Sequence, residues 1–363
     1  MLTLLLQQAK RKNQSLLWWL NLTSFIDDIR ERLRKALRRS EGACGMYHTA
    51  LALICEAGGY LEAIEIPEGA KTRLIDHRGE VLSEAVDITW PPACLRAMLD
   101  AGIFPREYDD LREVLTADDD LKRVRGVFGY GRIVRPVAIA LAKLITSGGR
   151  AEVYRDGLGV KVIFYGSNGD VISSARSVFC PACAAMIALA REPRLSTEVK
   201  KTLSGEKNTG RIKAERGIVN KIYWRNFRVE VELIEKGKKL GSNYGCCTAY
   251  AIVRTEAVCG FASPKGVKLI KAYCDQCPVK HIWLGKSMGA MGNVILKRMT
   301  DVGLKIELSY DNFLRITAKD NERSLGYGFG SLCALSASMN LLLRTEGIKI
   351  VRPQEAAALK SLS

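Results

Sequence analysis

Apolar and polar residues alternate in short stretches of the chain, as in Arg228–Leu233 and Leu304–Leu308. Alternation with a period of two is typical of β-strands that bury one face and expose the other. In other stretches apolar residues recur at helical spacing, as in Tyr47–Ala57, Val137–Thr146 and Gly292–Val302. Such strands favour antiparallel sheets with helices packed on one face, so the pattern predicts an α+β fold.

Short motifs recur along the chain at nearly constant spacing. The pair Gly58-Gly59 returns 90 residues later as Gly148-Gly149, and Asn226-Phe227 returns 86 residues later as Asn312-Phe313. We therefore expect four repeated helix–three-stranded antiparallel sheet–helix units, arranged as two tandem pairs. The second glycine of each Gly-Gly pair, and Gly303 in the last unit, are expected to end a helix in the left-handed conformation.

This division predicts four segments. They are an amphipathic basic helical segment at 1–45, a first duplicated domain at 46–194, a basic linker or arm at 195–216, and a second duplicated, strongly basic domain at 217–363. Apolar residues recur at helical spacing in the first segment. Its helix can therefore dock on the core, lie on a membrane surface or contact a phosphate backbone.

The composition is that of a globular protein. Of the 363 residues, 47% are hydrophobic and 26% charged, which excludes a disordered or collagen-like chain. No stretch reaches the ~18 apolar residues of a membrane span, and the N-terminus lacks the charge order of a secretory signal. Eleven cysteines without an export signal favour a reducing compartment, so we expect a cytoplasmic protein with no membrane span.

Positive charge is concentrated in the second half of the chain. The formal net charge is +16; residues 1–194 carry 27 basic and 24 acidic side chains, a net +3, whereas 195–363 carry 28 and 15, a net +13. Such an excess is typical of proteins that bind a polyanion, nucleic acid first, and a solvated surface is the alternative. The side chains expected to contact nucleic acid are Lys200, Lys201, Lys207, Arg211, Lys213, Arg216, Tyr223, Trp224, Arg225, Arg228, Lys265, Lys268 and Lys271.

Two Cys-x-x-Cys pairs could contribute thiolates to a zinc site, because cysteines at that spacing can share one tetrahedral ion. The better candidate combines Cys274, Cys277 and His281 with Cys180 as a further ligand. Burial in the core is the alternative, and it is the expectation for Cys183 at the start of an apolar helix. Zinc is the one cofactor that the sequence suggests.

A glycine-rich segment near the C-terminus is a second candidate binding feature. Gly326, Gly328, Gly330 and Ser331 are expected to form a turn from a strand into a helix, where backbone N–H groups can bind phosphate. This predicts, as an alternative function, an enzyme or ligand-binding protein for a phosphorylated metabolite. The related Gly241 in the preceding unit favours instead a structural need for glycine at this turn.

Two helical stretches, Leu51–Gly59 and Leu141–Gly149, resemble the helix that names the LAGLIDADG homing endonucleases. Members of that family are internally duplicated and bind DNA on a sheet, so the resemblance implies DNA binding of that kind. The family's metal-binding acidic residue stands just before the last glycine, where this chain has Gly58 and Gly148. The resemblance therefore implies a degenerate protein without an intact catalytic acid. An apolar helix ended by glycine is the alternative.

No set of catalytic residues can be assembled, because none of the three histidines lies in a known nucleophile motif. The leading interpretation is a non-enzymatic protein that binds the phosphate backbone of DNA or RNA through its basic second half. The degenerate endonuclease, the ligand-binding protein and a subunit of a larger assembly with protein partners are the alternatives.

Overall fold

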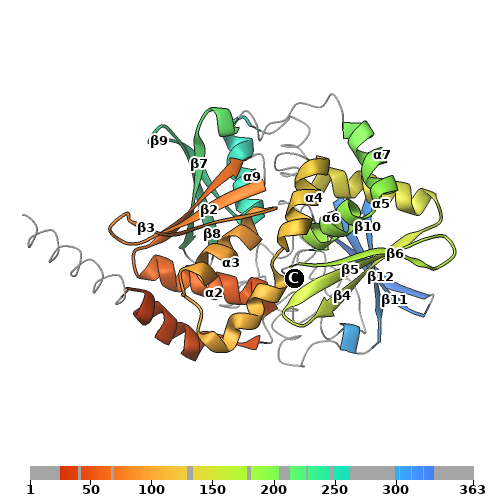
Figure 1. Ribbon diagram of the computed structural model, residues 1–363, viewed down its shortest axis with the longest axis horizontal. Coiled ribbons are helices and arrows are strands. Elements are labelled where there is room, and N and C mark those ends of the chain that lie inside the picture. The colour runs from red at the N-terminus through yellow and green to blue at the C-terminus, as the bar shows by residue number, and fades with distance from the viewer. Residues whose placement is uncertain are drawn as a thin grey trace, which may run out of the picture.

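The computed structural model describes residues 25–39, 42–66, 69–128, 134–177, 181–203, 213–225, 228–245, 248–261, 299–301, 303–311, 313–321 and 323–330. In these residues the chain forms two six-stranded antiparallel sheets, which lie at opposite sides of the view in Figure 1 with helices beside each of them. The α+β fold expected from the alternating pattern is confirmed.

The first sheet, called sheet A, has the strand order β3-β2-β1-β7-β8-β9. Its strands are β1 (Tyr60–Ile66), β2 (Gly69–Ile75), β3 (Val81–Asp87), β7 (Ile218–Arg225), β8 (Arg228–Glu235) and β9 (Lys238–Gly245). The second sheet, called sheet B, has the order β12-β11-β10-β4-β5-β6. Its strands are β4 (Arg150–Asp156), β5 (Gly159–Tyr165), β6 (Val171–Ser177), β10 (Lys305–Asp311), β11 (Phe313–Asp320) and β12 (Arg323–Gly330).

Each sheet takes three strands from each half of the chain. In sheet A, β1 pairs with β7 and Leu61 lies opposite Ile222; in sheet B, β4 pairs with β10 and Glu152 lies opposite Glu307. A three-stranded sheet leaves unpaired backbone groups at its edge, and joining two such edges satisfies them. The first three-stranded group therefore joins the third, and the second joins the fourth. The two groups within the range 46–194 thus belong to different sheets.

The helices cover the face of each sheet whose side chains are buried. Beside sheet A lie α2 (Gly42–Glu56), α3 (Trp90–Asp100) and α9 (Thr248–Val258). Beside sheet B lie α5 (Val134–Thr146) and α6 (Pro181–Arg191), which contact α4 (Asp118–Phe128) and α7 (Pro193–Leu203), and the 3₁₀ segment η2 (Arg106–Val114) leads from α3 to α4. The opposite face of each sheet, called its open face, carries the polar residues of the alternating pattern.

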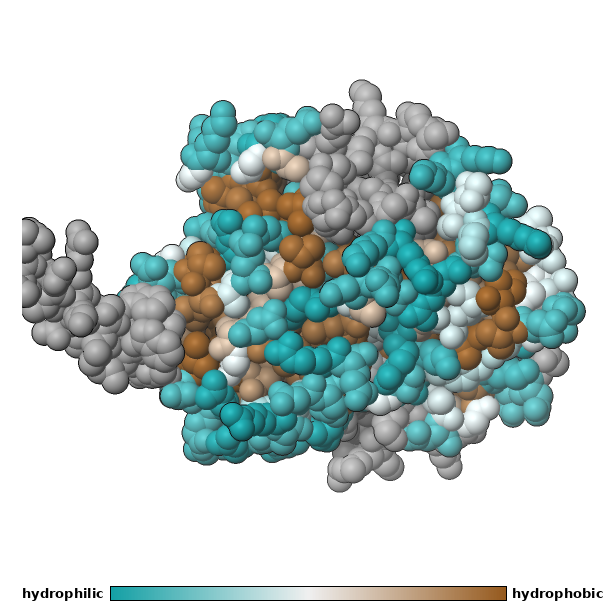
Figure 2. All heavy atoms as spheres, in the orientation of Figure 1, coloured by the Kyte–Doolittle hydropathy of each residue, from teal (hydrophilic) through white to brown (hydrophobic). Residues whose placement is uncertain are grey.

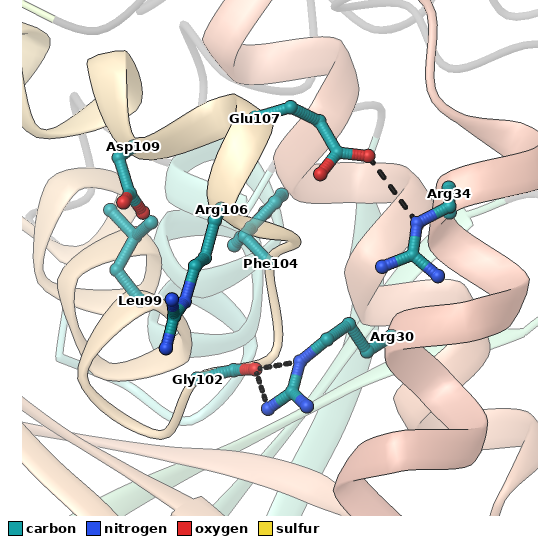
Figure 3. A pocket seen from close by; sticks show the side chains of 8 residues that line it. All are labelled: Arg30, Arg34, Leu99, Gly102, Phe104, Arg106, Glu107 and Asp109. Atoms are coloured by element: carbon teal, nitrogen blue, oxygen red, sulfur yellow. Dashed lines mark hydrogen bonds and ion pairs between the residues drawn. The ribbon is translucent and has the colours of Figure 1, made fainter.

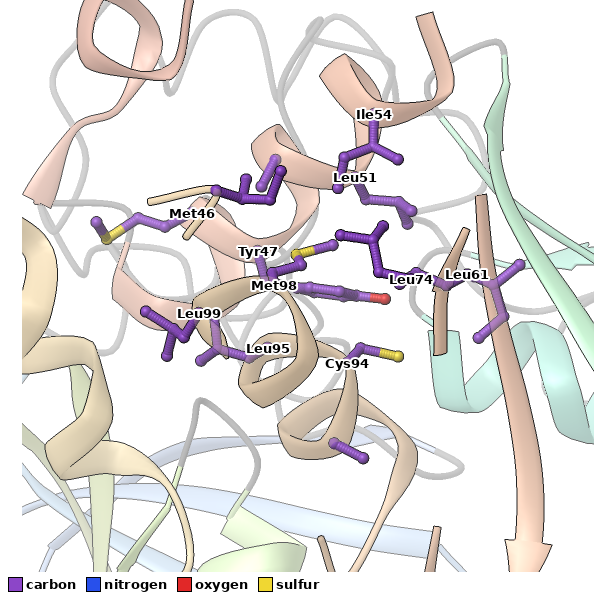
Figure 4. Close-up of a cluster of buried hydrophobic side chains, with 14 of the residues drawn as sticks. Met46, Tyr47, Leu51, Ile54, Leu61, Leu74, Cys94, Leu95, Met98 and Leu99 are labelled. Atoms are coloured by element: carbon purple, nitrogen blue, oxygen red, sulfur yellow. The ribbon is translucent and has the colours of Figure 1, made fainter. Parts of the chain in front are cut away.

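The core of the sheet A half lies between α2, α3 and the sheet. Figure 4 shows Tyr47 of α2 beside Met98 of α3 at the centre of the cluster, with Leu74 of β2 and Leu61 of β1 on the side of the sheet, all of them buried. Leu158, from the hairpin between β4 and β5, enters the same cluster, and its carbonyl oxygen accepts a 2.7 Å hydrogen bond from the backbone of α2. A hairpin of sheet B therefore contributes to the core of the sheet A half.

The helix at residues 25–36, in the first predicted segment, docks on this core. Phe25, Ile29 and Leu33 fall on one helical face and are buried, whereas basic residues such as Arg34 face outward. Burial of its apolar stripe is the usual source of stability for an amphipathic helix.

Part of the predicted linker at 195–216 is helical instead. Residues up to Leu203 belong to α7, because Val199 is buried and Glu198 forms an ion pair with Lys143 of α5. The polar composition of this stretch reflects the solvent-facing side of a packed helix. Residues 204–212 lie outside the described residues.

The glycine predictions at the helix ends need one correction. The left-handed residues after α2 and α5 are Gly58 and Gly148, with φ of 86° and 79°, rather than the glycines that follow them; Gly303, with φ of 80°, is as predicted. Gly59 is needed for a different reason, because a Cβ there would lie 2.8 Å from the carbonyl oxygen of Ile75. Both glycines of the pair are thus explained by the end of an apolar helix against a strand.

Hydrophilic residues cover most of the face seen in Figure 2, and apolar residues form smaller groups between them. Among the helices in the described ranges, none has the length and apolar character needed to cross a lipid bilayer.

Candidate nucleic-acid interface

Lys213 lies inside the molecule, where the sequence analysis expected a contact to nucleic acid. Its side chain is 4% exposed, and Nζ donates 2.5 Å hydrogen bonds to Oε1 of Glu65 on β1 and Oε1 of Glu256 on α9. Burial opposes the charge on the lysine, but the two carboxylates outweigh it and raise the pKa of Lys213. Lys213 therefore holds a strand and a helix together, and its charge is neutralised within the protein.

Two other predicted arginines are paired with glutamates on neighbouring positions of sheet A. The guanidinium of Arg216 contacts both carboxylate oxygens of Glu235, at 2.7 and 2.9 Å. Nη1 of Arg225 lies 3.2 Å from Oε2 of Glu230. These pairs offset the charge that the sequence analysis assigned to phosphate binding.

The two predicted stacking residues contact other aromatic rings of the protein. Tyr223, on the open face of sheet A, has its ring centroid 5.5 Å from that of Tyr60 and carries Arg225 over its ring. Trp224, on the opposite face, packs against the core with its ring centroid 5.5 Å from that of His48 on α2. Only Tyr223 is therefore on the same face as the polar side chains.

The remaining predicted residues are divided between the described part of the chain and the rest. Lys200 and Lys201 are exposed in the last turn of α7, and Arg228 is the first residue of β8. Outside the described residues lie Lys207, Arg211, Lys265, Lys268 and Lys271, together with Ser331 and the predicted zinc ligands Cys180, Cys274, Cys277 and His281.

The glycines at 326, 328 and 330 do not form the predicted turn. They belong to strand β12, where Gly326 lies opposite Ala318 and Gly328 opposite Ile316 of β11. Backbone N–H groups in a strand ladder do not converge on a single anion as those of a helix N-terminus do. The phosphate loop expected there is therefore replaced, over its described part, by an edge strand.

Cys94 and Cys183 are buried at the starts of α3 and α6. This confirms the structural interpretation of Cys183, whose Sγ lies 3.4 Å from Oγ1 of Thr89 between the two halves. In the part of the chain that the structure describes, no group of three or more potential metal ligands is close enough to bind one ion.

The open face of sheet A is a lattice of alternating charge. Across five adjacent strands the register places Glu84, Arg73, Glu62, Lys221 and Glu232 opposite one another in that order. Each cation in this row therefore lies between two carboxylates, and ion pairs connect Arg73 to Glu84 at 2.8 Å and Lys221 to Glu62 at 3.8 Å. Opposite charges directly across strands stabilise a sheet and leave little net charge for a ligand.

The open face of sheet B has the same layout but a different charge pattern. At its centre, where the halves meet, Glu152 and Glu307 face each other across β4 and β10. Beside this carboxylate pair the register places Arg176 opposite Lys161, and Lys161 opposite Tyr154, while Lys305 lies opposite Lys319. Lysines and arginines thus face one another across strands of this sheet, although some also form ion pairs with carboxylates of the same face, such as Arg176 with Asp156 at 2.8 Å.

The two open faces carry the same number of charged positions and differ in how these are arranged. By strand register, sheet B has six cations and four carboxylates: Arg150, Lys161, Arg176, Lys305, Arg315 and Lys319 against Glu152, Asp156, Glu307 and Asp311. Sheet A also has six cations and four carboxylates: Lys71, Arg73, Lys221, Arg225, Arg228 and Lys239 against Glu62, Glu84, Glu230 and Glu232. We call the six cations of sheet B, with its open-face tyrosines Tyr154, Tyr165 and Tyr327, the basic sheet face.

Hydrogen bonds fix the charged groups at the centre of the basic sheet face. Nε of Arg150 lies 2.7 Å from Oε1 of Glu152, and the hydroxyl of Tyr154 donates to the other oxygen. Burial alone would raise the pKa of Glu152, but these two donors outweigh it and lower the pKa. Glu307 accepts a 2.7 Å hydrogen bond from Lys319. The centre therefore carries two carboxylates, each with hydrogen-bond donors beside it.

Two arginines of the basic sheet face lie over tyrosine rings. Arg150 is 4.3 Å from the ring centroid of Tyr165, and Arg315 is 4.1 Å from that of Tyr327. A guanidinium over an aromatic ring is held flat and retains its charge. These stacks present planar, cationic surfaces.

A cavity of about 600 Å³ lies between the helix at 25–36 and the loop that follows α3 (Figure 3). Arg30 donates through Nε and Nη2 to the carbonyl oxygen of Gly102, at 2.8 and 2.6 Å, and Nε of Arg34 lies 3.4 Å from Glu107. These arginines hold the helix against the rest of the protein. The cavity is therefore a weaker candidate for a binding site than the basic sheet face.

No family model, curated protein or solved structure gives a significant match to this chain. The candidate interface therefore rests on the geometry of the two sheets.

Sequence reasoning missed the basic sheet face because half of it comes from the nearly neutral first half of the chain. Arg150, Lys161 and Arg176 are at alternating positions of β4, β5 and β6, so each was visible as a polar residue in a strand. The pairing of β4 with β10, which brings them beside Lys305 and Lys319, has no signal in local sequence.

Proposed function

We propose that this protein binds nucleic acid through the basic sheet face. The observation that carries the proposal is that cations face cations on neighbouring strands of sheet B, at Arg176–Lys161 and at Lys305–Lys319, whereas each cation in the central row of sheet A faces glutamates. Adjacent lysines and arginines repel one another in the absence of a ligand, and an anionic backbone relieves that repulsion. Arginine stacks and tyrosines beside the cations are what a surface for bases and phosphates provides.

The proposed binding surface differs from the one predicted from the sequence, which lay in the second half of the chain. The second half of the chain contributes Lys305, Arg315 and Lys319, and the first half contributes an equal number of cations. Binding is mainly electrostatic, as the leading interpretation of the sequence held, and needs no catalytic group.

Binding of a fluorescently labelled mixed-sequence 20-mer tests the proposal, with affinity measured by anisotropy at several salt concentrations. We expect the triple variant K161Q/K305Q/K319Q to bind at least tenfold more weakly at low salt. Its slope of log affinity against log salt should decrease by about 2, because each lost phosphate contact to a single strand contributes about 0.7.

The matched control removes three lysines from the open face of sheet A, in K71Q/K221Q/K239Q. Because those lysines are paired with glutamates or lie beside apolar residues, this variant should bind within about twofold of the wild type. Melting curves verify that both variants are folded. Equal losses in the two variants, or no binding by the wild-type protein at low salt, would contradict the proposal.

A further inference from the structure

We propose that the ligand of the basic sheet face is a single-stranded polynucleotide that crosses the strands of sheet B and places amino-bearing bases against Glu307. This inference rests on the proposed function and adds the class of nucleic acid. A duplex is the competing ligand.

A track for phosphates crosses the sheet on one side of the carboxylate pair. It consists of Arg176 on β6, Lys161 on β5, Lys305 on β10 and Lys319 on β11. With strands ~4.8 Å apart, the four intervals from β6 to β11 span about 19 Å. On sheet A the corresponding row is apolar at its centre, where Ile64 and Val219 face each other. The phosphate track is therefore a property of sheet B.

The carboxylate pair lies two residues from this track along each strand, a distance of about 7 Å. Glu152 is engaged by Arg150 and Tyr154 and its side chain is 4% exposed. The side chain of Glu307 is 25% exposed, and the hydrogen bond from Lys319 uses its Oε1. Glu307 is thus the carboxylate that a ligand can reach, whereas Glu152 is buried.

An ionised carboxylate only accepts hydrogen bonds, so Glu307 selects bases that donate. Cytosine and adenine present an exocyclic amino group, whereas thymine and uracil offer a single N3–H flanked by two carbonyl oxygens, which a carboxylate repels. In a duplex the amino groups keep one free hydrogen, but it lies in the major groove. That groove is about 12 Å wide and a six-stranded sheet with strands ~4.8 Å apart is about twice as broad, so the contact to Glu307 requires an unpaired base.

Planar surfaces on the other side of the carboxylate pair can hold such a base. The Arg150–Tyr165 stack lies on the first-half side of the sheet and the Arg315–Tyr327 stack on the second-half side. Unpaired bases stack on tyrosine rings and on guanidinium planes irrespective of sequence. The face therefore provides three features in adjacent rows: cations that can contact phosphates, a carboxylate that accepts hydrogen bonds from base amino groups, and flat surfaces on which bases can stack.

Anisotropy titrations with labelled 12-mers test the inference on the full-length protein. The probes are dC12, rC12, dT12 and a 12-base-pair mixed duplex, all at the same ionic strength. We expect dC12 to bind about tenfold more tightly than dT12, which is within the discrimination that one specific base contact provides, and the duplex to bind more weakly than dC12. Tighter binding of either dC12 or rC12 supports the inference and identifies the preferred sugar.

The decisive variant is Glu307→Gln, whose amide both donates and accepts. It should reduce the preference for dC12 over dT12 to within about twofold, with dT12 binding no more weakly than to the wild type. Glu62→Gln on sheet A is the matched control and should leave the preference unchanged. Equal binding of dC12 and dT12 by the wild type, or a preference unaffected by Glu307→Gln, would overturn the inference and leave the proposed function intact. If none of the probes bound, the proposed function itself would fail.

Discussion

Sheets A and B have the same strand arrangement, but opposite charges face each other at the centre of sheet A and like charges at the centre of sheet B. In sheet A the pair that faces across the joined edges is Glu62 and Lys221, which attract each other. In sheet B the corresponding pair is Glu152 and Glu307, which repel each other. Opposite charges across strands stabilise the folded sheet, whereas like charges that face one another oppose folding and are relieved by a ligand of compensating charge. The difference is the basis of the proposal that sheet B, rather than sheet A, is the binding face.

The buried sides of the two sheets also differ, in the polarity of the side chains at corresponding positions. Sheet A buries Lys213 and Asn220, and the residues 86 positions later, on the sheet B side, are Met299 and Ile306, both buried. At these two positions the sheet A half buries an ionisable and a polar group where its partner buries apolar side chains. The stability of the sheet A half should depend on pH and on ion pairing more strongly than that of the sheet B half.

The largest expected effect follows from removing the buried cation of sheet A. Lys213→Met leaves Glu65 and Glu256 without their common partner, so we expect the free energy of unfolding to fall by about 3–5 kcal/mol. Urea denaturation measures the change. Met299→Leu, the matched substitution in the sheet B half, should cost less than about 1.5 kcal/mol.

Adding E65L and E256L to K213M should restore most of the lost stability, because the uncompensated buried charges are removed. A loss below about 1 kcal/mol for K213M alone would show that the interiors of the two halves do not differ as described.

A second effect is a dependence of stability on pH that arises in the sheet A half. His48 on α2 is buried beside Trp224, and burial lowers its pKa from 6.5 to about 4. The folded protein favours the neutral imidazole, so this contribution is complete above pH 6.5 and is lost as the pH falls through that value towards 4. The loss should reach about 3 kcal/mol, at 1.36 kcal/mol for each unit of pKa.

Urea denaturation at pH 7.5, 6, 5 and 4 measures this dependence, with His48→Phe as the comparison. The residue 90 positions later is Ala138, which does not titrate. The variant should lose less stability than the wild type between pH 6.5 and 4. Parallel curves for the two proteins would place the acid sensitivity elsewhere.

The smallest effect is expected from exchanging the central pairs of the two sheets. Lys221→Glu gives sheet A the like-charge pair of sheet B and should cost about 1 kcal/mol. Glu307→Lys gives sheet B the attractive pair of sheet A but removes the acceptor of Lys319, so it should change stability by less than Lys221→Glu does. Thermal and urea unfolding at low salt measure both changes. A loss for Glu307→Lys as large as that for Lys221→Glu would contradict the comparison.

Much of the local structure was predictable from the sequence. The alternation in Arg228–Leu233 predicted a strand, and β8 covers it; apolar spacing in Val137–Thr146 predicted the helix now labelled α5. Burial of one strand face or one helix stripe leaves a periodic trace in the residues themselves. The glycines of the predicted phosphate turn lie in strand β12 over their described part, because alternating glycines occur in strands as well as in turns, and the phosphate site that includes Ser331 stays a prediction.

The candidate site was predictable only in its chemistry. The charge excess indicated a polyanion, but Lys213 lies between two carboxylates, while the cations of the basic sheet face include Lys161 from the nearly neutral half. Counts along the chain treat every lysine alike, whereas burial and the nearest carboxylate decide which lysines present their charge to solvent.

The sequence by itself determined the elements, the α+β class and the positions that face the core, because each depends on residues within a turn or two of one another. Only the tertiary structure decided which strand edges join. Backbone hydrogen bonding across an edge is the same for any sequence, so the choice between partners depends on how whole three-stranded groups and their helices pack. That choice places Glu152 against Glu307 and gathers the cations of both halves on one face.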